Sequence, residues 1–267
     1  MPSTTIFKRA AEFRPCALVP VYNHYLELPG LVAAFTALDL PVLLVDDGSV
    51  PPARTALDAL AESNSDRIEL LRFERNRGKG AALLAGFARA AENGYTHAVQ
   101  IDADGQHDPL DARALLALAR EHPQALVSGT PAYDDSVPRV RYYGRWITHL
   151  LIWFATLSRD ITDSMCGFRI YPLAPTLALA RRRKIGTRMD FDTDIMVRLY
   201  LAGTPVLFAP VRVSYPPGGL SNYRMLRDNL RMAGLHLRLL GGLPGLAVRR
   251  LLSCARVGRS GKHASPP

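Results

Sequence analysis

The feature that most constrains the fold is a regular alternation, over the first 130 residues, of short apolar runs with longer segments rich in alanine and leucine. The apolar runs predict strands at 17–20, 42–45, 68–73, 98–101 and 126–128. The segments between them predict helices over 25–38, 53–63, 80–93 and 110–122. Uniformly apolar strands that alternate with amphipathic helices are typical of a parallel sheet covered by helices on both faces. We therefore predict an α/β fold with a mostly parallel sheet.

Beyond residue 130 the pattern is less regular. It predicts a loop over 130–145, helices over 144–158, 174–182 and 192–202, strands near 168–171, 206–208 and 211–215, and a basic helix from about residue 221. The expected organisation is an N-terminal extension (1–14), one α/β domain (15–220), a basic helical segment (221–257) and a disordered tail (258–267).

Composition narrows the class of protein. The 267 residues are 48% hydrophobic and 21% charged, which is ordinary for a globular protein. The three cysteines have no metal-ligand spacing, and an odd number of them suggests reduced thiols. Residues 1–14 lack the apolar core of a signal peptide, and no run reaches the 18–20 apolar residues of a membrane span. These features favour a cytoplasmic protein.

Positive charge is concentrated at the C-terminal end. The chain carries a net charge of +9, and nine basic residues but only one acid lie from Arg224 onward. Such a segment attracts nucleic acid, anionic lipid or phosphorylated substrates. No nucleic-acid-reading motif accompanies it, so we expect no nucleic-acid partner. The segment is interpreted either as a solvated arginine-rich helix or as a contact with an anionic membrane surface.

Polar residues follow each of the first four predicted strands, at 22–24, 46–49, 75–80 and 102–107. Because the carboxyl ends of parallel strands meet at one edge of a sheet, we expect these turns to lie together and to form the ligand site. Their carboxylates, amides, glycines and cations suit an anionic ligand that is bound through a divalent metal ion.

The turn at 102–107 is the expected metal site. Asp102 and Asp104 flank the end of a strand, and Gln106 adds a neutral oxygen. Mg²⁺ or Mn²⁺ prefers such oxygen ligands together with substrate phosphates, and stabilises a diphosphate as it leaves. The alternative is that acids here only serve a helix N-terminus. We assign that role to Asp108, which precedes a proline.

Four ordered motifs now suggest a family. The segments 19–23 (VPVYN), 45–49 (VDDGS), 76–80 (NRGKG) and 101–107 (IDADGQH) resemble the family 2 glycosyltransferases, in particular the dolichyl-phosphate mannose synthase-like branch. The resemblance covers about residues 15–235. It implies the GT-A fold, a Rossmann-like architecture of nucleotide-diphospho-sugar transferases.

The resemblance also implies roles for individual residues on the donor side. The nucleoside would be contacted by Pro20, Tyr22, Asn23, Asp46 and Asp47, and Lys79 would face the donor. Asp102, Ala103 and Asp104 would hold the metal, the diphosphate and the sugar, with Gln106 among the metal ligands.

On the acceptor side, Gly167, Phe168 and Arg169 match the family's Gly-Phe-Arg segment. Asp194 occupies the position of the acid that deprotonates an acceptor hydroxyl in inverting transferases, with Asp192 as second candidate. Both acids also suit a helix N-terminus, and an acceptor that is already ionised needs no base.

The nature of the acceptor is left more open. Ser221 and Arg224 are the acceptor-side candidates of a late segment in which Asn222 stands where the family usually has lysine. A polyprenyl phosphate and another membrane lipid or acyl chain are therefore both considered. The family's processive Gln-x-x-Arg-Trp motif is absent, which favours a single transfer.

The segment 144–158 combines aromatic and aliphatic residues with flanking arginines. This pattern is typical of an interfacial helix, although a helix packed on the sheet would show it as well.

Together these observations predict a metal-dependent, inverting glycosyltransferase. It would move one sugar from a nucleotide-diphosphate sugar to a lipid-linked acceptor, at the cytoplasmic face of the cell membrane. The alternatives are a sugar nucleotidyltransferase, for which segment 18–24 lacks the glycine-rich triphosphate loop, and a membrane-bound nucleotide-sugar-binding protein without catalysis.

Overall fold

A seven-stranded sheet forms the centre of the computed structural model, which describes residues 12–133, 139–214 and 225–243. The strands are β1 (Pro15–Val21), β2 (Val42–Asp46), β3 (Ile68–Arg72), β4 (His97–Gln100), β5 (Leu126–Tyr133), β6 (Arg169–Pro172) and β7 (Val206–Val213). Their spatial order is β3-β2-β1-β4-β6-β5-β7. Only β6 runs antiparallel to its neighbours, so the predicted mostly parallel sheet is confirmed.

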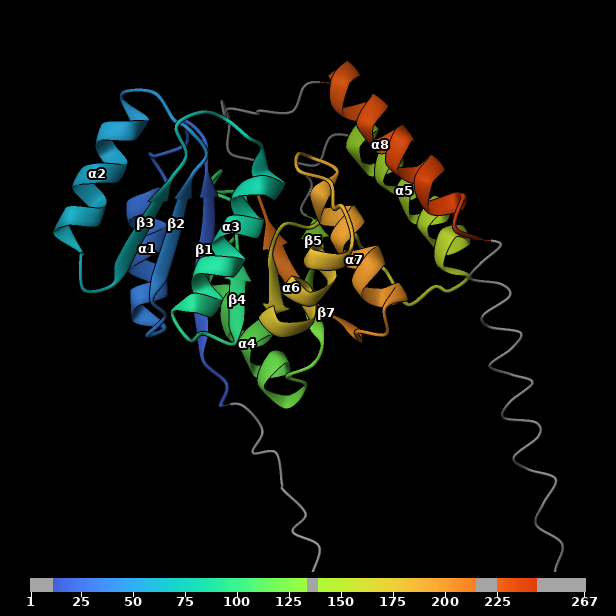
Figure 1. Cartoon of the computed structure of the whole chain (residues 1–267), viewed down its shortest axis with the longest axis horizontal. Helices are drawn as coiled ribbons and strands as arrows, with labels where there is room; N and C mark the ends of the chain where they lie inside the picture. Colours follow the sequence, from blue (N-terminus) through green and yellow to red (C-terminus); the bar gives the residue numbers. More distant parts are fainter. Residues whose placement is uncertain (1–11, 134–138, 215–224, 244–267) are drawn as a thin grey trace, which may run out of the picture.

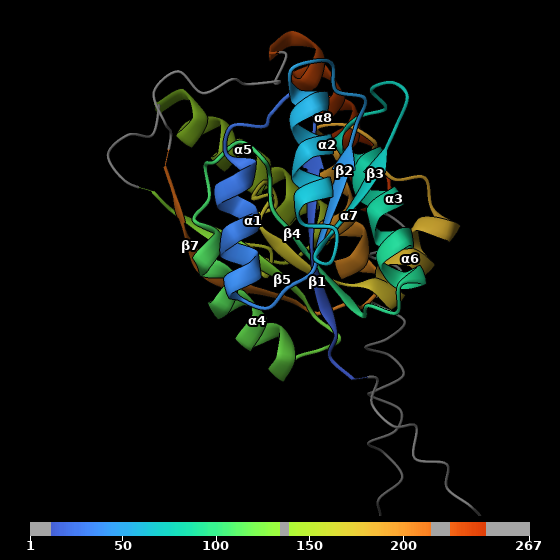
Figure 2. The ribbon, with the colours of Figure 1, turned by 90° about the vertical axis from the view of Figure 1, so that its left-hand side faces the viewer.

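Helices cover both faces of this sheet (Figures 1 and 2). They are α1 (Leu28–Ala37), α2 (Ala53–Ser63), α3 (Lys79–Glu92), α4 (Ala112–Glu121), α5 (Arg139–Thr156), α6 (Leu173–Arg182), α7 (Phe191–Leu201) and α8 (Met225–Leu240), with a short 3-10 helix at Pro109–Asp111. Asp108 caps that short helix through a hydrogen bond from the Leu110 amide, as its sequence context predicts.

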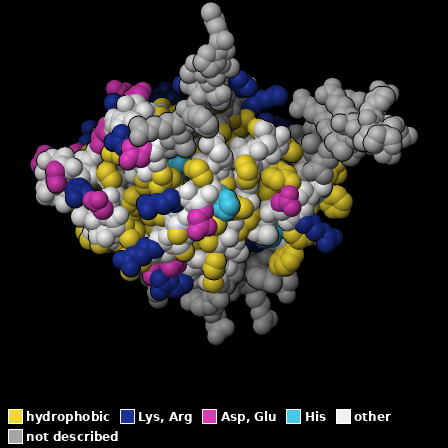
Figure 3. Space-filling view, turned by 90° about the horizontal axis from the view of Figure 1, so that it is seen from below, with side chains coloured by type: hydrophobic (Ala, Val, Ile, Leu, Met, Phe, Trp, Pro, Cys, Tyr) yellow, Lys and Arg dark blue, Asp and Glu magenta, His cyan; other side chains and the backbone are white. Residues whose placement is uncertain are grey.

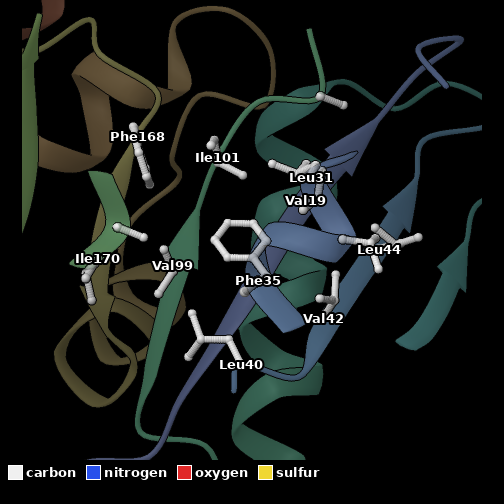
Figure 4. Close-up of a cluster of buried hydrophobic side chains, with 14 of the residues drawn as sticks. Val19, Leu31, Phe35, Leu40, Val42, Leu44, Val99, Ile101, Phe168 and Ile170 are labelled. Atoms are coloured by element: carbon white, nitrogen blue, oxygen red, sulfur yellow. The ribbon is translucent and has the colours of Figure 1, made fainter. Parts of the chain in front are cut away.

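The core lies in two layers because the strand side chains alternate between the two faces of the sheet. Val19, Leu44 and Val99 point to the layer that contains α1, where Phe35 is fully buried among them (Figure 4). Leu18 and Val45 point to the opposite layer, which is formed largely by α3, α6 and α7. Strands buried on both faces explain the uniformly apolar runs of the sequence.

The expected loop over 130–145 is wrong at both ends. Strand β5 continues to Tyr133, and α5 begins at Arg139. The two separate strands expected near 206–215 are one strand, β7, despite Pro210. Proline is tolerated there because β7 is an edge strand, and its pairing with β5 extends that strand beyond the two residues that pair with β6.

Helices α5 and α8 lie side by side at one end of the molecule (Figure 1). Ile152 and Ala155 of α5, and Leu235 and Leu239 of α8, are buried in the layer that contains α7. The expected basic helix is therefore confirmed over 225–240. The predicted extension before residue 12 and the tail 258–267 lie outside the described residues.

The face seen from below in Figure 3 carries acidic, basic and hydrophobic side chains that are interspersed. The turns predicted to form the ligand site follow the carboxyl ends of β1, β2 and β4, which point upward in Figure 1, and that of β3.

Candidate functional site

The turns after β1 and β2 are joined by hydrogen bonds. The Asn23 amide donates to Ser49 Oγ at 2.9 Å, and Asn23 Oδ1 accepts from the Val50 amide at 3.0 Å. Asn23 adopts φ of 60°, a left-handed conformation that asparagine tolerates better than most residues. Tyr22 and Pro20 are half-buried beside this junction. The first two motifs therefore form one structural unit.

Two adjacent aspartates then tie this unit to neighbouring elements. Asp46 accepts from the Ser49 amide at 2.8 Å and pairs with Arg72 Nε of β3 at 2.7 Å. The Asp47 carboxylate accepts from the amides of Arg77 and Gly78 at 2.6 and 2.8 Å. Both carboxylates thus position the turns around them, and their oxygens already have partners within the protein.

Two glycines allow the turns to pack closely. Gly48 has φ of 76°, and a Cβ atom there would lie 2.5 Å from the Arg75 carbonyl carbon. Gly78 has φ of 104°, and its Cβ atom would lie 2.4 Å from the Thr187 carbonyl oxygen. A side chain at either position would separate turns that meet at the site.

Lys79, the first residue of α3, connects these turns to the acidic motif. Its Nζ atom lies 2.7 and 2.8 Å from the two Asp102 oxygens and 2.7 Å from Asp192 Oδ2 of α7. Burial lowers the pKa of Lys79, but the charges of Asp102 and Asp192 outweigh burial and hold this pKa above its usual range. Lys79 is therefore a permanent cation between two carboxylates that are distant in sequence.

The acidic motif has the properties of a cation site. Asp102 Oδ1 is buried and lies 2.7 Å from Lys79 Nζ, and Asp104 Oδ1 accepts from the Gln106 amide at 3.1 Å. Burial and the nearby charge of Asp102 raise the pKa of Asp104. A divalent cation would relieve this repulsion between the two carboxylates.

Ala103 is buried between these two acids. Within the described residues no three His, Cys, Asp or Glu side chains gather as a metal site. Asp102 and Asp104 offer two carboxylates, and an amide oxygen, water and phosphate would have to complete the coordination of a bound Mg²⁺.

The two acids proposed as bases are both buried and engaged. Asp192 Oδ1 accepts from Gln100 Nε2 at 3.0 Å, and Oδ2 pairs with Lys79. Asp194 is 1% exposed, accepts from the Gly186 amide at 2.8 Å and pairs with Arg198. Burial raises the pKa of Asp192, but Lys79 and Arg169 outweigh this effect and hold it below its usual range.

The Gly-Phe-Arg segment packs directly against the acidic motif. A Cβ atom at Gly167 would lie 2.4 Å from Asp102 Oδ2, so only glycine fits there. Arg169 is completely buried and donates to the backbone oxygens of Ser164 and Asp192. Phe168 is buried in the core. This segment positions Asp102 and α7 together.

Comparison with known proteins identifies the family. The family Glycosyl transferase family 2 matches residues 16–187, more than half of the chain. The chain belongs to glycosyltransferase family 2.

A relative from Mycolicibacterium smegmatis, polyprenol monophosphomannose synthase, is 35% identical over 243 residues, which span 82% of this chain and 84% of that protein. This family 2 glycosyltransferase also resembles two solved enzymes in fold. Glucosyl-3-phosphoglycerate synthase from Mycobacterium tuberculosis aligns with a TM-score of 0.65 at 14% identity, over 86% of this chain and 81% of that one. A mannosyltransferase from Pyrobaculum calidifontis, in complex with GDP-Man and Mn²⁺, aligns with a TM-score of 0.53 at 18% identity, over 95% of this chain and 76% of that one. The predicted GT-A fold is confirmed.

The glycosyltransferase brings most of the predicted site residues to one edge of the sheet. Two predicted residues, Ser221 and Arg224, lie outside the described residues. Sequence reasoning missed Gln100 and Arg72, which hold the predicted acids Asp192 and Asp46 in place. Gln100, the last residue of β4, is the one polar residue of the strand predicted over 98–101, and that polarity was the available signal.

Proposed function

We propose that this glycosyltransferase moves a single sugar from a nucleotide-diphosphate sugar to the phosphate of a membrane polyprenol, with inversion at the anomeric carbon. The observation that carries the proposal is a series of contacts through the four turns that ends at the Lys79–Asp102 pair, from which Lys79 reaches Asp192 on the expected acceptor side. The relative whose name specifies a polyprenol monophosphomannose product supports this acceptor class.

The donor half of the site would act by positioning. Tyr22 and Asn23 are half-buried at the junction of the first two turns and would contact the nucleoside. Pro20, which is half-buried near the end of β1, would contact it as well. Asp46 and Asp47 would act mainly by fixing that junction, because backbone amides and Arg72 already engage their oxygens. A pre-formed site of this kind orients the reacting atoms without reorganisation.

A divalent cation, Mg²⁺ or Mn²⁺, would be held by Asp102, Asp104 and Gln106. When bound, it would neutralise the charge that develops on the leaving diphosphate. The Mn²⁺ complex of the mannosyltransferase with the same fold supports this class of cofactor.

An ionised acceptor would explain why both buried acids are held in ion pairs and neither is available as a base. A phosphate oxygen is nucleophilic without the loss of a proton, so the transfer requires no general base. Asp192 and Asp194 would then orient α7 and the acceptor side, since each already has cationic partners. Gly167 and Arg169 would keep this side in contact with Asp102.

Helices α5 and α8 would hold the enzyme at an anionic membrane surface. Phe154 of α5 and Leu237 of α8 are 65% and 72% exposed, and further exposed apolar side chains on the two helices, or directly after α5 in the case of Leu157, are Trp146, Ile147, Leu150, Leu157, Leu226 and Leu230. Arg159, Arg227 and Arg238 are exposed on or beside these helices. Apolar side chains with flanking arginines suit the boundary between headgroups and acyl chains. No helix among the described residues has the length and apolarity to cross a membrane.

The test of function is transfer of radiolabelled sugar from UDP-, GDP- and dTDP-sugars to polyprenyl phosphate in detergent, with Mn²⁺ or with EDTA. We expect one nucleotide to support transfer with metal only, and a product of inverted anomeric configuration. Transfer to a neutral lipid instead of the lipid phosphate would overturn the acceptor assignment. Donor binding without turnover on any membrane lipid extract would identify a nucleotide-sugar-binding protein.

The membrane proposal has its own test. We expect sedimentation with vesicles that contain anionic lipid, a large loss of binding in high salt, and weak binding to neutral vesicles. Leu230→Ser together with Leu237→Ser should reduce this binding, whereas Leu201→Ser, an exposed leucine of α7, is the matched control. Equal sedimentation of all variants would contradict the role of these helices.

A further inference from the structure

Lys79 was expected to face the donor, yet its ammonium group is already bound on two sides. Both Asp102 oxygens lie within 2.8 Å of Nζ, and Asp192 Oδ2 lies at 2.7 Å. The two partners come from the end of β4 and from the first turn of α7, so the contact spans the site. A lysine with this geometry is not a free phosphate ligand.

Asp192 depends on this contact. It is 7% exposed, and its other oxygen accepts only the neutral amide of Gln100 at 3.0 Å. Arg169 reaches the backbone oxygen of Asp192 and not its carboxylate. Lys79 is thus the cation that directly pairs with this buried carboxylate, which ties α7 to α3.

Asp102 has two roles, because it pairs with Lys79 and is also an expected ligand of the divalent cation. Gly167 closes one side of its carboxylate, where even a Cβ atom would lie 2.4 Å from Oδ2. A cation that approached Asp102 would therefore meet the fixed charge of Lys79 at short range in a buried setting, where such repulsion is strong. A nucleoside diphosphate bound at the same time would bring the negative charge that offsets it.

We propose that Lys79 is a positioning residue that links Asp102 to Asp192, and that it makes the site bind a divalent cation tightly only together with a nucleoside diphosphate. The inference rests on the proposed donor and metal site. It assigns to Lys79 the coupling between the two ligands, and it gives Asp192 a role as the second anchor of that lysine.

The test measures Mn²⁺ binding by the electron paramagnetic resonance signal of free Mn²⁺, alone and with UDP or GDP. For the wild-type protein we expect at least about tenfold tighter Mn²⁺ binding with the correct nucleotide, within the usual range of coupling between sites. Lys79→Met should bind Mn²⁺ alone about tenfold more tightly than wild type and lose most of the coupling. Lys184→Met, which removes an exposed lysine just beyond α6, is the matched control and should behave as wild type.

A separate measurement of stability distinguishes a loss of coupling from a loss of folding. Lys79→Met leaves Asp192 buried without its cation, so urea unfolding should show a loss of stability. The double variant Lys79→Met/Asp192→Asn removes both charges, and we expect it to regain stability while the coupling stays lost. A purely structural role for Lys79 predicts instead that the coupling returns with stability.

Wild-type Mn²⁺ affinity and coupling in Lys79→Met would overturn the inference. So would a return of coupling in the double variant. Failure of the proposed function is distinguishable, because Mn²⁺ affinities measured without nucleotide report on Lys79 even for a protein that transfers no sugar.

Discussion

The edge of the sheet where the four turns lie, which we propose binds the donor and call the donor edge, differs from the α5–α8 pair in how its side chains are partnered. At the donor edge, polar groups from four turns are buried and partnered with one another, as in the contacts of Asp47 and Lys79. On α5 and α8, apolar side chains such as Phe154 and Leu237 are left in contact with solvent.

The difference shows where each region finds its partners. A network that is satisfied internally fixes one geometry, which is what a small charged ligand requires. Exposed apolar side chains on a pair of helices suit a partner outside the protein, and we propose a lipid surface for that role. Changes at the donor edge should therefore affect chemistry and stability, whereas changes on the helix pair should affect location.

The largest expected effect is on chemistry. Asp104→Asn should lower the transfer rate about 10³-fold, because metal stabilisation of a leaving group is worth several kcal/mol. Steady-state kinetics with saturating donor and acceptor measures this change. Vesicle binding of the same variant should be unchanged, and a loss of both properties would contradict the separation of the two regions.

A large effect on stability is expected where the two regions join. Arg145 of α5 pairs with buried Asp163 at 2.6 Å, and Asp163 also accepts from the amides of Met165 and Cys166, next to Gly167. Asp163→Asn should reduce the free energy of unfolding by about 3 kcal/mol, as the loss of a buried ion-pair partner does.

This effect should depend on pH with a defined sign. Burial raises the pKa of Asp163, but Arg145 and the two amides outweigh it and hold the pKa below its usual range. A depressed native pKa stabilises the protein fully above the unfolded pKa of about 3.9, and the stabilisation is lost as pH falls through the native value. Urea unfolding should therefore show a constant difference between wild type and Asp163→Asn near neutral pH, and a smaller one below about pH 4. A difference that grows on acidification would contradict this assignment.

A smaller effect is expected for the turn that carries Lys79. Asp47→Asn leaves one of the amides of Arg77 and Gly78 without an acceptor, which should cost about 2 kcal/mol of stability. The same variant should raise KM for the donor more than it lowers kcat. A kcat effect with an unchanged KM would place Asp47 in the chemical step.

The smallest effect on stability is expected on the helix pair. Leu237→Ser should change the free energy of unfolding by less than about 0.5 kcal/mol, because the side chain is exposed. Thermal unfolding without lipid measures this change. A loss of several kcal/mol would mean that the side chain packs within the protein, and not against a membrane.

Much of the fold and of the candidate site could be predicted from the sequence, for a physical reason. Strands buried on both faces leave continuous apolar runs, and the residues that follow them must lie at one edge. The positions of Asp102 and Asp104 in the site were therefore predictable. The family resemblance added the GT-A fold and directed attention to the Gly-Phe-Arg segment around Gly167, for which an acceptor-side role stays a prediction.

The remainder depends on contacts between distant segments. The pairing of Lys79 with Asp192 joins residues 113 apart, and neither position alone indicates it. The continuation of β5 to Tyr133 depends on pairing with β7, some 80 residues later, which overrides the turn-like character of Pro131. In α5, Ile152 is buried, as expected for a helix packed on the sheet, whereas Phe154 is exposed, and its contact with a membrane stays a proposal.

The central claim is a metal-dependent nucleotide-sugar site built by the four turns. Its most direct test is the thermal unfolding of wild type and Asp104→Asn with UDP-, GDP- or dTDP-sugars, in Mn²⁺ or in EDTA. We predict that one base stabilises the wild type with metal only, by about 2.7 kcal/mol at 100 times the Kd, and that Asp104→Asn loses this effect. No stabilisation by any donor with Mn²⁺, or equal stabilisation of both proteins in EDTA, would contradict the account.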